Sequence, residues 1–113
     1  MKVLKDVDKV LHIMDAKVDE FHKRFDEADE EKAAEIYGQE DAIGSIAFHI
    51  RHAIEDHGYF GVEDMACVYD YVDDAKGKDY EHPNPRDTWF MKGIAKGAAW
   101  ACAKLEDRME DQP

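Results

Sequence analysis

The most constraining feature of this chain is an apolar stripe near its start, because the spacing of the stripe fits only a helix. From Leu4 to Phe25 the apolar side chains recur at alternating steps of three and four residues. Such steps gather side chains on one face of an α-helix, whereas they would scatter them over both faces of a strand. We therefore predict a helix over about residues 3–27, with a stripe of Leu4, Val7, Leu11, Met14, Val18, Phe21 and Phe25.

Three further segments carry the same helical period. A second helix is predicted over about residues 40–57, where the stripe is rich in isoleucine, and a third over 61–77. A last helix is predicted from Pro85 to about residue 110. Asn84 is a good capping residue for it, and proline suits the first helical position.

The acidic stretch between the first two helices leaves two alternatives open. Asp29 can cap a helix there, and Gly38 is the kind of residue at which helices commonly stop. Residues 30–37 therefore form either a short fifth helix or the beginning of the helix predicted over 40–57.

These elements predict an all-α fold, a compact antiparallel bundle of four main helices. The 113 residues are enough for one domain, and the connections are short except for a Pro/Gly-rich loop over residues 75–86. No segment shows the alternation of a strand, and the acidic tail 110–113 is expected to fray.

The charge of the chain excludes several classes of partner. There are 27 acidic residues against 15 basic ones, a formal net charge of −12, which repels nucleic acid and anionic membranes. No apolar run approaches the roughly 20 residues of a membrane span. Cys67 and Cys102 are far apart and form no CxxC pair. We expect a reduced, cytoplasmic protein that binds neither nucleic acid nor membrane.

Two stripes of histidine and aspartate are the candidates for a metal site. Side chains three or four residues apart on a helix are neighbours, and imidazole with carboxylate suits Zn, Fe, Ni or Mn. The candidate ligands are His12, Asp15, Asp19 and His22 on the first helix, and His49, His52 and Asp56 on the second.

The alternative is that these stripes are solvated faces. Metal sites in bundle cores need ligands that point inward, as in the Glu-x-x-His pairs of ferritin-like proteins, and the inward positions here are apolar. We expect no cofactor on this alternative. His57 differs from the other histidines, because its place at a helix C-terminus favours a structural role.

The last helix has more apolar surface than one core face requires. Trp89 and Trp100 lie on the side opposite its core stripe, with Gly93 and Gly97 allowing another backbone to come close. These four residues predict a contact with another protein or with a second copy of the chain, in a homodimer. The alternative is that this helix is central and buried on two sides within its own chain.

These patterns favour a binding protein over an enzyme. The sequence shows no nucleophile with a nearby base and no phosphate-binding glycine loop. The leading hypothesis is protein binding or self-association through the last helix, with metal binding as the first alternative. A second alternative is an acidic mimic of nucleic acid that inhibits a nucleic-acid-binding protein, although lysines interrupt the acids of the first helix.

Overall fold

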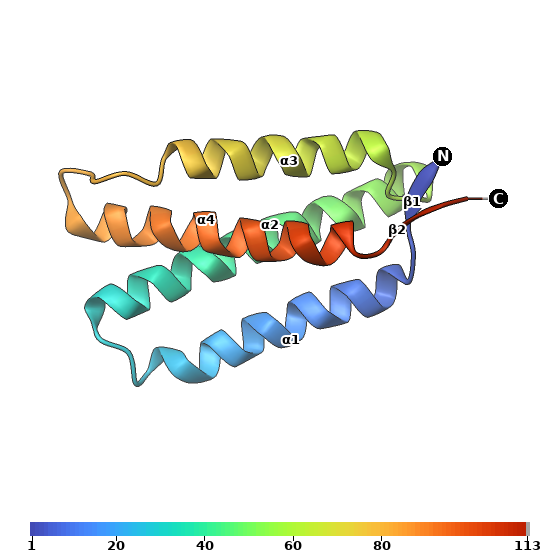
Figure 1. Ribbon diagram of the computed structural model, residues 1–113. Helices are drawn as coiled ribbons and strands as arrows, with labels where there is room; N and C mark the ends of the chain where they lie inside the picture. Colours follow the sequence, from blue (N-terminus) through green and yellow to red (C-terminus); the bar gives the residue numbers. More distant parts are fainter. Residues whose placement is uncertain (113) are drawn as a thin grey trace.

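A computed structural model describes residues 1–112, which fold into the predicted bundle of four helices (Figure 1). Two short strands formed by the chain ends lie beside one end of the bundle. In chain order the elements are β1 (Lys2–Leu4), α1 (Val7–Phe25), α2 (Glu30–His57), α3 (Val62–Gly77), α4 (Pro85–Glu106) and β2 (Met109–Asp111). Within the described residues, no helix is both long and apolar enough to cross a bilayer.

The parallel pair α2 and α4 forms the centre of the bundle, held at very short range by glycines. A Cβ atom at Gly93 would lie 2.1 Å from the carbonyl oxygen of Glu35, and one at Gly97 would lie 2.7 Å from that of Gln39. At Gly38 the distance to the carbonyl oxygen of Phe90 would be 2.2 Å. Since such separations are far below van der Waals contact, only glycine permits this approach of the two backbones.

The other two helices flank this pair. α1 runs antiparallel to α2 and packs chiefly against it, while α3 packs chiefly against α4 (Figure 1). The core between them is apolar, with no buried polar or charged side chain among the described residues. Its largest fully buried side chains are Phe60, Met14, Ile43, Ile50, Leu105, Val10 and Val68.

The prediction that the chain contains no strand is wrong. β1 and β2 pair antiparallel, with Lys2 opposite Asp111 and Leu4 opposite Met109. Leu4 therefore lies in a strand, and α1 begins only at Val7. Three-residue strands are too short to show alternation, and they pair because the bundle brings the two ends of the chain together.

The end of the chain is also more ordered than expected. Glu110 and Asp111 belong to β2, and the Gln112 backbone N–H donates to the Met1 carbonyl over 2.8 Å. Pro113, the last residue of the predicted frayed tail, lies outside the described residues.

α2 is one continuous helix, which decides between the two alternatives for residues 30–37. The Asp29 side chain accepts a hydrogen bond from the Lys32 backbone N–H over 2.8 Å and caps the helix. Gly38 does not stop it, because this glycine is needed inside the helix for the contact with α4. The helix ends at Gly58, whose φ of 85° is in the left-handed region that glycine tolerates.

A substitution at the α2–α4 contact tests this architecture. We expect Gly93→Ala to lower the free energy of unfolding by at least about 2 kcal/mol, because the new methyl group meets backbone rather than a movable side chain. Urea denaturation followed by circular dichroism measures the effect.

The matched control is Gly77→Ala. Its Cβ would meet nothing within 4 Å, so its stability should stay within about 0.5 kcal/mol of wild type. Equal stabilities of the two variants would contradict the close contact between α2 and α4.

Candidate functional site

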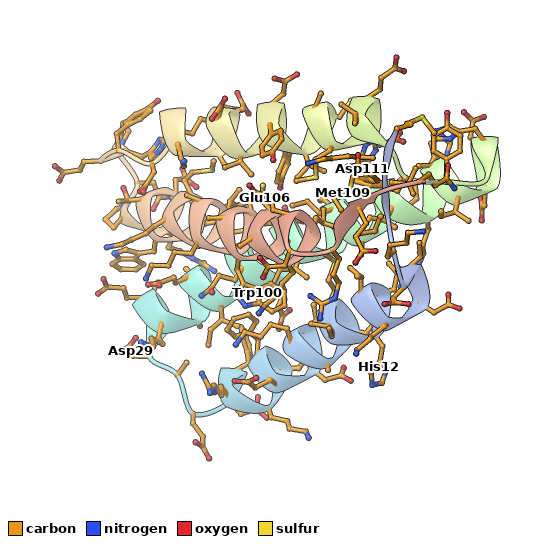
Figure 2. All side chains as sticks on the ribbon, turned by 45° about the vertical axis from the view of Figure 1, so that its right-hand side comes forward. His12, Asp29, Trp100, Glu106, Met109 and Asp111 are labelled. Atoms are coloured by element: carbon orange, nitrogen blue, oxygen red, sulfur yellow. The ribbon has the colours of Figure 1, made fainter. Side chains whose placement is uncertain are left out.

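The predicted metal ligands of α1 lie along its flank and face α2 only in part. The Asp15 carboxylate is 3.3 Å from Nη2 of Arg51, and Nδ1 of His22 is 3.1 Å from Oε1 of Glu40. Asp19 lines a hollow beside the same two helices. His12 is exposed on α1 and projects away from the bundle (Figure 2).

The predicted ligands of α2 have different surroundings. Nε2 of His49 is 3.3 Å from the backbone carbonyl oxygen of Asp64, so this histidine faces α3. The His52 ring stacks on Phe48 with their centroids 6.2 Å apart, and Asp56 is exposed. His49 therefore lies away from the α1 stripe.

The structure does not bring the two stripes together. The α1 stripe meets the side of α2 that carries Glu40 and Arg51, whereas His49 lies on the side next to α3. Over residues 1–112, no three His, Cys, Asp or Glu side chains are grouped so that they could hold one ion. Asp15, His22 and His49 instead contact groups on neighbouring helices.

His57 lies at the C-terminal end of α2 and contacts the start of α3. Its Nε2 is 3.3 Å from Oδ1 of Asp64, whose other carboxylate oxygen accepts the Gly61 backbone N–H over 2.8 Å. Asp64 thereby caps α3 and ties the end of α2 to the start of α3. The His57 ring also packs edge-on against Tyr59, at a centroid distance of 4.4 Å.

The glycines of the predicted α4 contact are already covered by the chain itself. Gly93 and Gly97 are buried against α2, which corresponds to the alternative of a central helix. They are therefore not free to receive a partner. Trp89 and Trp100 are half-buried, and Trp100 lies between α4 and α1 (Figure 2).

Trp100 lines an open groove of about 670 Å³ between α1, α2 and α4. We name it the cationic groove. Four basic side chains line it, against two acidic ones, Glu27 and Glu35. The basic residues are Lys17, Arg24, Lys32 and Lys96, and the apolar lining is Phe21, Ala28, Ile36, Ile43 and Trp100.

Three of the four cations of the groove are held over aromatic rings or in ion pairs. Nζ of Lys17 is 5.1 Å from the ring centroid of Phe21 and 5.7 Å from that of Trp100. Arg24 donates to Glu20 over 2.7 Å, and Lys96 pairs with Glu35. The Lys32 ammonium has no acidic partner among the described residues.

Sequence reasoning identified only Trp100 of this groove. The cations come from three helices, so their convergence depends on how the helices pack. One signal was present: Lys17, Phe21 and Arg24 are spaced i, i+4 and i+7, which places them on one face of α1.

The two cysteines have contrasting environments. Cys67 is exposed on α3, whereas Cys102 is buried in α4. Burial, followed by a hydrogen bond to Glu106 and the negative charge of that carboxylate, raises the pKa of the Cys102 thiol to about 11. The thiolate is the reactive form of cysteine. Cys102 is therefore unreactive for two reasons: reagents cannot reach the buried side chain, and its thiol stays protonated.

A thiol titration checks this contrast. We expect the thiol reagent dithionitrobenzoate to modify Cys67 rapidly in the native protein at mildly alkaline pH, and Cys102 only after denaturant is added. Cys67→Ser is the control and should show no rapid phase. A rapid phase that persists in this variant would contradict the burial of Cys102.

Elemental analysis tests the metal hypothesis. It predicts a near-stoichiometric transition metal in untagged protein purified without chelator, with loss of the metal when His49 and His52 are both replaced by alanine. Protein that holds no metal, and whose thermal stability is unchanged in added zinc, iron or manganese, would argue against the hypothesis.

The chain matches no protein-family model, no curated protein and no solved structure.

Proposed function

We propose that this protein is a binding protein whose ligand has an anionic group on an apolar body and sits in the cationic groove. The observation that supports the proposal is that basic residues outnumber acidic ones in the lining of the groove, although the chain as a whole is strongly acidic. Four of the 15 basic residues of a chain with net charge −12 converge on one hollow. They do so around an aromatic and aliphatic lining, a combination suited to an amphipathic anion.

The ion pairs of Lys17 and Arg24 can exchange for a ligand. Over residues 1–112, Glu20 is the only acidic residue that pairs with Lys17 and Arg24, and its carboxylate is about half exposed. Exposed ion pairs of this kind contribute roughly 0–1 kcal/mol. A carboxylate, sulfonate or phosphate can therefore replace such a partner at small cost, and Lys32 offers a further unpaired charge.

The apolar lining supplies the other half of the recognition. Phe21 and Ile36 are buried side chains at the base of the groove, and Trp100 adds a flat ring that is half-buried. A volume of about 670 Å³ lies within the roughly 300–1,000 Å³ that is usual for small-molecule sites. A ligand with an aromatic or aliphatic body could bury that body here while its charge stays at the lysines.

The acidic surface around the groove limits where an anion can bind, and it does not strengthen the binding. Carboxylates elsewhere on the surface repel an anion, so productive binding is limited to the place where cations prevail. Binding should weaken as salt screens the lysines. A neutral molecule of the same shape would lose the charge interaction and should bind less tightly.

A fluorescent probe tests the groove directly. We expect anilinonaphthalene sulfonate, an aromatic anion, to bind once per chain and to be displaced by dodecanoate. The double variant Lys17→Gln/Lys96→Gln should raise the dissociation constant of the probe about tenfold, because two charge contacts are lost. Probe fluorescence and unchanged circular dichroism are the readouts.

The control variant removes two exposed lysines outside the groove, Lys9→Gln/Lys76→Gln, and so changes the net charge equally. It should bind the probe nearly as well as wild type. Equal weakening in both double variants would show that net charge rather than the groove attracts the probe, and would contradict the proposal.

A further inference from the structure

The side of α2 that faces away from α4 is exposed along much of the helix, and we call it the α2 outer face. Its residues are Asp41, Gly44, Ser45, Phe48 and His52, all of them exposed. The Phe48 side chain is 69% exposed, more than any other large apolar side chain among the described residues.

Gly44 is unlike the glycines of the α2–α4 contact. A Cβ atom at this position would meet nothing within 4 Å, so the packing of the chain does not require glycine here. Glycine inside a helix is destabilising relative to alanine. Its presence one helical turn before Phe48 therefore leaves an open notch beside a protruding aromatic ring.

The outer face is hollowed on both sides of this notch. A hollow of about 390 Å³ lies over Gly44, Ser45 and Phe48. It adjoins one of about 430 Å³ toward α1, which Gly44 also lines, and one of about 300 Å³ toward α3, which Ser45 and Phe48 also line. Cys67 and Tyr71 add to the lining on the α3 side.

We propose that a second copy of this chain docks on the α2 outer face, with the two α2 helices antiparallel. In a two-fold symmetric pair, each residue meets one that lies equally far on the other side of the axis. When the axis passes level with Ile46, Phe48 of one chain enters the notch at Gly44 of the partner subunit, and the partner's Phe48 enters the notch of the first chain. One patch thus supplies both the protrusion and the recess.

The charges of the outer face match in the same register. Asp41 precedes the notch and His52 follows it, so an antiparallel partner places these two side chains opposite each other. Helix positions advance about 100° per residue, which puts Asp41 and His52 about 20° and 40° to one side of Phe48. Asp41 then faces His52 of the partner subunit.

A second pair lies on the opposite side of the contact. Glu40 and Arg51 fall about 80° and 60° to the other side of Phe48, so Glu40 faces the partner's Arg51. These side chains already pair with α1 through His22 and Asp15 respectively. Asp41 and His52 have no polar partner among the described residues, and they are the pair to test.

This surface is separate from the cationic groove. The groove uses Lys32, Ile36 and Ile43 of α2, none of which belongs to the outer face. It also differs from the dimer predicted through the last helix, since Gly93 and Gly97 are covered by α2. Loss of probe binding and loss of self-association can therefore be measured independently.

Sedimentation equilibrium tests the proposal. We expect wild-type protein to form a dimer of twice the 13.0 kDa chain mass. Gly44→Gln should raise the dimer dissociation constant at least about tenfold by filling the notch. Its thermal stability at low protein concentration should be unchanged or higher, because nothing in the chain opposes a side chain there. If Gly44 were needed only for the fold of the chain, Gly44→Gln would lower the thermal stability together with the affinity of the dimer.

Phe48→Glu should weaken the dimer as strongly. The matched control is Tyr80→Glu, an equally drastic change at an exposed aromatic residue outside the outer face, which should leave the dimer intact. A chain that is monomeric at every soluble concentration, or a dimer that neither Gly44→Gln nor Phe48→Glu weakens, overturns the proposal.

Charge exchange tests the antiparallel register. Asp41→Lys and His52→Glu should each weaken the dimer, the first by placing lysine opposite histidine and the second by placing glutamate opposite aspartate. The double variant restores opposite charges and should recover most of the affinity. If each single variant weakens the dimer but the double variant does not recover the affinity, this register is wrong.

Discussion

The contact between the backbones of α2 and α4 is the interaction on which the rest of the structure depends. Three glycines, Gly38, Gly93 and Gly97, let two parallel helices approach more closely than side chains normally allow. With this pair at the centre, α1 and α3 occupy its flanks, α1 chiefly on α2 and α3 chiefly on α4. Both candidate surfaces follow from that arrangement: the cationic groove opens where α1 meets α2 and α4, and the opposite side of α2 is left uncovered (Figure 1).

The distribution of charge gives these surfaces their different chemistry. A core without buried polar groups leaves every acidic side chain near the surface, where repulsion is weakened by water and salt. The groove is the place where basic residues outnumber acidic ones around an apolar lining. The α2 outer face instead carries Asp41 and His52 on either side of the notch at Gly44, an arrangement that suits a copy of itself in the proposed register.

The histidines show how far residue spacing can predict a site. The i, i+3 and i+4 spacings correctly indicated which side chains share a helix flank, but spacing within one helix does not tell what lies opposite that flank. His22 meets Glu40, and His49 meets a backbone carbonyl next to α3. The two stripes are therefore separated by the width of α2. Similarly, the two glycines of α4 were identified as sites of close approach, while the approaching backbone was that of α2.

The sequence by itself determined the helices, their capping residues, the apolar faces and the bundle class, because these depend on local periodicity and local hydrogen bonds. Asp29 before α2 and Asn84 before α4 belong to this group. Only the tertiary structure decided that α2 runs through Gly38, that the chain ends pair as strands, and that four cations from three helices converge beside Trp100. Each of these depends on contacts between residues far apart in the chain, and helix packing sets those contacts.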